Sequence, residues 1–171
     1  MHAEALTIYL NDHLAGATTG VELSRRIARA HRSSGRAATL RSLAEDISQD
    51  RQTLLDLMDA LDVTPQRYKI CAGWMAEKAA RLKPNGRLRH RSGLSSLIEL
   101  ETLRIGIQGK FQLWRALMPV AAELDRLDTA RLRKLMDRAR DQMATVDALH
   151  GAAATAVLSP RTARPGAPVP G

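Results

Sequence analysis

The chain has 171 residues, enough for one domain whose core needs no disulfide or metal to be stable. Its single cysteine excludes an intrachain disulfide, and its few aromatic residues predict an aliphatic core. Glu4 and Asp12 interrupt the N-terminal apolar residues, so we expect no signal peptide. No apolar run is long enough to cross a bilayer, and we therefore expect a soluble cytoplasmic protein without a transmembrane segment. The net charge of +8 points to a polyanionic partner, although arginine-rich genomic base composition produces the same charge without a binding site.

Two long helices joined by a tight turn are predicted in the first third of the chain. Apolar residues recur at steps of three and four over residues 3–32 and again over residues 36–61, and Ser33-Ser34-Gly35 separates the two segments. Asp50 and Arg51 fall where the second apolar stripe should continue, so one polar group is expected to face inward there. The two stripes consist of Leu6, Leu10, Leu14, Val21, Ile27 and Ala30, followed by Leu40, Leu43, Ile47, Leu54, Met58 and Leu61.

A shorter helix is predicted over residues 65–82. Thr64 has the character of an N-cap. Pro65 suits the first helical position, because the backbone N–H at that position has no acceptor within a helix and proline loses nothing by lacking it. The segment 84–86 ends this helix, and a basic loop continues to residue 92.

A second pair of long helices follows. The first begins near residue 93, and Pro119 predicts a kink or a break just before it. Asp128 is the expected cap of the last helix, and residues 159–171 are rich in Pro and Gly and are expected to be disordered. The apolar stripes are Leu94, Leu97, Ile98, Ile105, Phe111, Trp114 and Leu117, and then Leu132, Leu135, Ala139, Met143, Val146, Leu149 and Ala153.

The order of these elements predicts an all-α fold over residues 1–158. Each tight turn makes its two helices antiparallel neighbours, and about thirty residues between the hairpins are enough to carry the chain back along the bundle. Two hairpins joined by one long crossover are typical of a ferritin-like four-helix bundle, here with an extra crossover helix.

The sequences of two segments support a resemblance to the same family. The opening Tyr9-Leu10-Asn11-Asp12-His13-Leu14-Ala15 resembles the first helix of small bacterial ferritin-like proteins of uncharacterised type. The segment from Leu94 to Leu117, with Glu99, Glu101, Lys110 and Trp114, resembles their third long helix. The resemblance covers most of residues 3–158 and rests on layout rather than on a diagnostic motif.

A ferritin-like layout implies a test for a di-iron centre. Such centres take Glu from two helices and Glu-x-x-His from the other two. The sequence offers an incomplete set, with Asp147-x-x-His150 in the last helix and a serine, Ser48, where Glu45 would need its histidine. Counted from one end of the bundle, five groups are expected at a similar level, and they are the candidate ligands of iron or another divalent transition metal: Glu22, Glu45, Glu101, Asp147 and His150.

A structural interpretation of the same residues stays open. Glu22 has Arg25 and Arg26 at helical spacing, as in an ordinary surface pair, and His150 with Glu101 suits a satisfied core pair. Under this interpretation the polar layer is structural, and no cofactor is expected.

Basic residues gather in two parts of the sequence that the crossover would bring to one end. Residues 25–41 hold six arginines and no acid, and residues 64–93 hold eight bases against one acid. Acidic residues collect at the other end. The candidate anion-binding residues are Arg25, Arg29, Arg32, Arg36, Lys83, Arg87, Arg89 and Arg91. Nucleic acid is a possible partner, although no aromatic residues lie among these bases to stack on it.

Three functional hypotheses follow. The first is a non-enzymatic ferritin-like bundle that acts through protein contacts, with another protein or as a homodimer. The second is a divergent metal-binding ferritin-like protein, a metal store or an oxidase. The third is a polyanion-binding module that uses the basic end.

Overall fold

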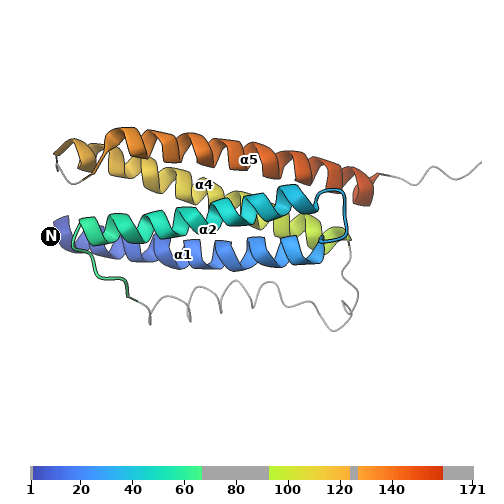
Figure 1. Ribbon diagram of the computed structural model, residues 1–171, viewed down its shortest axis with the longest axis horizontal. Coiled ribbons are helices and arrows are strands. Elements are labelled where there is room, and N and C mark those ends of the chain that lie inside the picture. Colours follow the sequence, from blue (N-terminus) through green and yellow to red (C-terminus); the bar gives the residue numbers. More distant parts are fainter. Residues whose placement is uncertain (1, 67–92, 124–126, 160–171) are drawn as a thin grey trace, which may run out of the picture.

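The computed structural model describes residues 2–66, 93–123 and 127–159, and all regular structure in these ranges is helical (Figure 1). The four helices are α1 (His2–Ala30), α2 (Ala37–Ala60), α4 (Gly93–Glu123) and α5 (Thr129–Leu158). This confirms the all-α prediction and both tight turns. The predicted helix 65–82, the basic loop to residue 92 and nearly all of the predicted tail lie outside the described residues.

The ends of α2 and α5 have local explanations. Asp128 caps α5, as predicted, because its carboxylate accepts a hydrogen bond from the Ala130 amide at 2.7 Å. At the end of α2, Asp62 takes a left-handed conformation with φ of 56°. The amide of Val63 then reaches back to the carbonyl of Met58 at 2.8 Å, which is the closing hydrogen bond of a Schellman motif.

Pro119 lies inside α4, and the helix continues past it to Glu123. The break that the sequence predicted is therefore absent. The ring of Pro119 leaves the carbonyl of Arg115 without its helical donor, but both residues are exposed, so water can reach that carbonyl.

The four helices lie along one common direction (Figure 1). α1 and α2 run antiparallel, as do α4 and α5, while α4 starts at the end of the bundle opposite to the one where α2 finishes. The chain therefore returns along the length of the bundle between residues 66 and 93. α1 packs against α2 and α4, and α4 packs most extensively against α5.

The hydrophobic core consists of two separate clusters. One cluster surrounds Trp114, Leu10 and Met58, and the other surrounds Ile27, Leu103 and Val146. The predicted stripes of α1, α2 and α5 supply most of both. In α4 the prediction was partly wrong: Leu97, Trp114 and Leu117 are buried as predicted, but Leu94, Ile98 and Ile105 are exposed. The other buried residues of α4 are Leu100, Leu103, Ile107, Leu113 and Ala121.

Asn11 holds the chain at the point where it leaves α2. Its side chain is almost fully buried in α1, and its Oδ1 accepts a hydrogen bond from the Gln66 amide at 2.6 Å. Its Nδ2 donates to the carbonyls of Thr64, at 3.3 Å, and Thr7, at 2.9 Å. The start of the crossover is therefore fastened to the first helix by one side chain.

Candidate functional site

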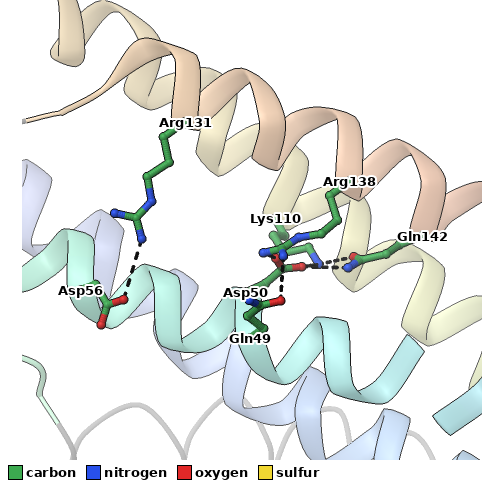
Figure 2. Close-up of polar contacts among 7 residues, drawn as sticks. All are labelled: Gln49, Asp50, Asp56, Lys110, Arg131, Arg138 and Gln142. Carbon is green, nitrogen blue, oxygen red and sulfur yellow. Dashed lines mark hydrogen bonds and ion pairs between the residues drawn. The ribbon is translucent and has the colours of Figure 1, made fainter. Parts of the chain in front are cut away.

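A cluster of charged and polar side chains lies in the middle of the bundle, and we call it the middle cluster. Asp50 of α2 is 2 % exposed and stands at its centre. Its carboxylate accepts hydrogen bonds from Lys110 of α4 and from Arg138 and Gln142 of α5 (Figure 2). The Gln142 contact is 2.9 Å long, and the Gln142 side-chain oxygen accepts a further hydrogen bond from Lys110. Three helices are thus joined at one buried carboxylate.

The middle cluster separates the two hydrophobic clusters from each other. Two further polar contacts join α2 and α5. Arg138 donates to Gln49 at 2.9 Å, and Arg131 forms an ion pair with Asp56 at 3.8 Å (Figure 2). Asp56 and Arg131 are both half exposed, so this outer pair contributes little to stability.

Burial affects Lys110 most strongly. Its side chain is 13 % exposed, and desolvation lowers the pKa of its ammonium group below the ordinary value, although the neighbouring Asp50 carboxylate acts in the opposite direction. The Nε atom of Arg138 is buried without a hydrogen-bond partner among the described residues. The cluster therefore carries a desolvation cost that its own hydrogen bonds offset in part.

The middle cluster does not fit a di-metal centre. Such a centre needs several carboxylates to neutralise two cations, whereas the cluster has one carboxylate, Asp50, already paired with two cationic side chains. The positive charge that a metal would bring to this layer is supplied by Lys110 and Arg138.

The five candidate ligands do not form the internal layer that the sequence predicted. Glu22, Glu45, Glu101 and Asp147 are all exposed, and His150 is partly exposed. The prediction ranked these residues by their level along the bundle, but the direction of each side chain depends on its angular position around the helix, which rotates by about 100° per residue.

On the α4–α5 surface the candidates pair with other side chains. His150 Nε2 and Glu101 Oε1 are 3.0 Å apart, and Asp147 accepts a hydrogen bond from Arg104 at 2.9 Å. Glu101 looked unusual because it shares a stripe with Ile98 and Ile105, but that stripe is exposed, so the carboxylate is solvated by water there. Within the described ranges, no three His, Cys, Asp or Glu side chains lie close enough together to hold a metal ion.

The predicted basic end is partly observed. One groove is lined by Arg25 and Arg29 of α1, by Arg32 of the turn after α1 and by Arg41 of α2, and we call it the arginine groove. Its volume is about 620 Å³. Arg36 is exposed at the turn and does not line the groove, while the candidates Lys83, Arg87, Arg89 and Arg91 lie outside the described residues.

Small side chains explain why the groove is open. Ala28 of α1 and Ala37 and Ala44 of α2 line it, and a methyl group cannot fill the space between two helices. Longer side chains then surround this apolar floor. Arg25 is the arginine with a partner there, because it donates to the Ser48 hydroxyl at 3.0 Å.

An exposed row of large apolar side chains runs along α4. Leu94, Ile98 and Ile105 are 49 %, 39 % and 65 % exposed, and their spacing of four and seven residues puts them on one face of the helix. We call these three residues the α4 apolar row. None of the four described helices combines the length and hydrophobicity that crossing a membrane requires.

No protein-family model matches the sequence, and no curated protein or solved structure is found to be similar to it. The class that the described helices define is an all-α bundle of four long helices.

Sequence reasoning found part of the middle cluster. It expected a polar group to face inward at Asp50 or Arg51, and Asp50 does so, but it missed the partners Arg138 and Gln142. Gln142 lies on the apolar stripe of α5, three residues after Ala139 and four before Val146. A polar residue at that position was the signal that could have identified it.

Proposed function

We propose that this chain is a non-enzymatic helical bundle of ferritin-like layout that acts through protein contacts, first of all with a second copy of itself. The observation that carries the non-enzymatic part is the middle cluster. It is a charged cluster inside the bundle, and its single carboxylate, Asp50, is already paired with the cationic side chains of Lys110 and Arg138. Because Lys110 and Arg138 already supply the positive charge beside Asp50, this cluster does not need a metal ion to neutralise its carboxylate.

The α4 apolar row supports the contact with a second copy. A two-fold axis presents the same surface to itself, so an apolar row on one molecule meets an identical row on the other. Gly106 and Gly109 lie beside the row, with no atom of another element within 4 Å of where a β-carbon would stand, so a second helix is able to approach closely. Burying three large aliphatic side chains is a favourable contribution to such an association.

Light scattering coupled to size exclusion tests the association directly. We expect the wild-type chain to have the mass of a dimer and Ile105→Lys to have the mass of a monomer, because the charge cannot be buried at the contact. Ile8→Lys is the matched control, since Ile8 is 57 % exposed on α1 and lies outside the row. A wild-type chain that stays monomeric at high concentration, or loss of the dimer in both variants, would contradict the proposal.

Metal analysis tests the non-enzymatic part. Protein purified without chelator and then offered ferrous iron is expected to retain less than stoichiometric metal after desalting. Stoichiometric binding that Asp147→Ala and Glu101→Ala abolish would favour the metal-binding alternative instead.

A further inference from the structure

The arginine groove has the features of a binding site for a small anion. Arg25 and Arg29 are four residues apart on one face of α1, and Arg32 follows in the turn just after the helix ends. Arg41 faces them from α2. We propose that this groove binds a small ligand through a short linear chain of phosphate groups, a binding site independent of the self-association proposed above.

The charge of the groove is not neutralised by the protein. Within the described part of the chain, Arg29, Arg32 and Arg41 form no hydrogen bond or ion pair. Glu45 is the acid that lines the groove, so the side chains around it carry a net charge of three positives, four arginines against one glutamate. A bound anion would compensate this charge.

The beginning of α2 adds a second, independent preference for an anion. Ala37, the first residue of α2, lines the groove. The Ala37 amide donates to the Ser34 carbonyl at 3.0 Å, but no side chain caps this end and its first turn contains no acidic residue, so the positive end of the helix dipole is uncompensated. At α5, in contrast, Asp128 fills this role. Phosphate groups bind readily at helix ends of this kind.

The size and lining of the groove favour a small ligand over a nucleic acid. Its volume of about 620 Å³ is in the range of small-molecule sites. The groove has no aromatic side chain on which a base could stack. Each guanidinium group can donate two hydrogen bonds to the oxygens of one phosphate. Three arginines on one side of the groove and one on the other side therefore match successive phosphates of one chain.

Calorimetric titration of the full chain with inorganic tripolyphosphate tests the proposal, with orthophosphate as the comparison. We expect tripolyphosphate to bind at least about tenfold more tightly than orthophosphate, because it contacts several arginines at once. The affinity should fall steeply as salt is raised.

Four single variants locate the site. Arg29→Gln and Arg41→Gln should each weaken tripolyphosphate binding about tenfold. Glu45→Gln should tighten it, because the acid in the groove repels phosphate. Arg133→Gln on α5 is the matched control, since it removes the same charge from an exposed position away from the groove and should leave the affinity unchanged. All four positions are exposed, and circular dichroism confirms that each variant is folded.

Several results would overturn the proposal. Equal losses in Arg133→Gln and Arg41→Gln would mean that net charge, and not the groove, attracts the ligand. An unchanged affinity in Glu45→Gln would show that the groove is not the binding site. A single-stranded oligonucleotide with the same number of phosphates that binds more tightly than tripolyphosphate would show that the ligand class is wrong.

Discussion

The middle cluster and the arginine groove place the same kinds of cationic side chain in opposite situations. In the middle cluster, Lys110 and Arg138 are largely buried and both donate hydrogen bonds to Asp50. In the groove, Arg29 and Arg41 are exposed and have no partner among the described residues. In the first arrangement both cations are paired with a carboxylate, whereas in the second neither arginine is paired with a described residue.

This difference separates structural charges from charges that are available to a ligand. A buried cation without its carboxylate costs several kcal/mol, so no single charged partner of the middle cluster can be removed without a large loss of stability. Exposed arginines cost little when they are unpaired, and water screens their mutual repulsion. The composition of the groove is therefore not dictated by stability, and function is the better explanation for it.

Removing the carboxylate from the middle cluster should have the largest effect. Asp50→Ala leaves Lys110 and Arg138 without their shared partner, and we expect the free energy of unfolding to fall by about 3–5 kcal/mol. Urea unfolding followed by circular dichroism measures it. Asp56→Ala is the matched control, because its pair with Arg131 is half exposed and should contribute less than about 1 kcal/mol. Similar losses in the two variants would mean that the middle cluster is no more important than a surface pair.

Replacing the whole middle cluster should reverse that loss. When Asp50, Lys110, Arg138 and Gln142 are all changed to Leu or Met, no buried charge remains, and the two hydrophobic clusters become continuous. We expect a free energy of unfolding equal to that of the wild type or higher by about 1–4 kcal/mol, measured in the same urea titration. A quadruple variant as unstable as Asp50→Ala would indicate that the polar contacts themselves hold α2 against α5.

The pH dependence of stability should reveal Lys110. Its pKa is lowered from the ordinary 10.5 in the folded chain, so between the lowered value and 10.5 the unfolded chain binds more protons than the folded one. The stability of the folded chain therefore rises with pH through this range, because the cost of burying the charged ammonium group is relieved as it loses its proton. With Lys110→Met as reference, the wild type should gain stability relative to the variant in unfolding titrations that approach pH 10.5. A constant or falling difference would contradict the assignment.

The arginine groove should give the smallest change in stability. Arg41→Gln removes a positive charge from the first turns of α2 and from a cluster of like charges, so we expect unfolding to become harder by up to about 0.5 kcal/mol. Thermal unfolding in low salt measures the shift, which added salt should reduce. A loss above about 1 kcal/mol would show that Arg41 has a structural role and would weaken the contrast with the middle cluster.

The sequence was sufficient to predict the four described helices and their order, because the apolar period and the turn signals depend on neighbouring residues. It failed on α4, where apolar residues occur on two faces, Leu97, Leu100 and Ile107 on one and the α4 apolar row on the other. Periodicity cannot choose between two apolar faces. Only the packing of α4 against α1 and α5 decides which face is buried.

The candidate site was harder to predict for a related reason. Counting residues from one end of a helix estimates the level of a side chain along the bundle. Two neighbouring residues at nearly the same level can nevertheless point in different directions, one toward the core and one away from it. Glu45 follows the buried Ala44, and Glu22 lies between the buried Val21 and Leu23. The arginines at 25, 29 and 32 were found because residues 25–41 hold six arginines and no acid, whereas the packing of α1 against α2 brings Arg41 to the same groove.

Asn11 has a consequence for how the topology is chosen during folding. After a helical hairpin the chain can start the next core helix at once, antiparallel to the last one, or it can first return along the bundle and start that helix parallel to the last one. Both routes bury similar apolar surface. The hydrogen bonds from Asn11 to Thr64 and Gln66 join residues more than fifty positions apart and hold the exit in one direction. One buried amide thus favours the parallel order of α2 and α4 before the second hairpin docks, and its loss would leave two competing connections of similar free energy.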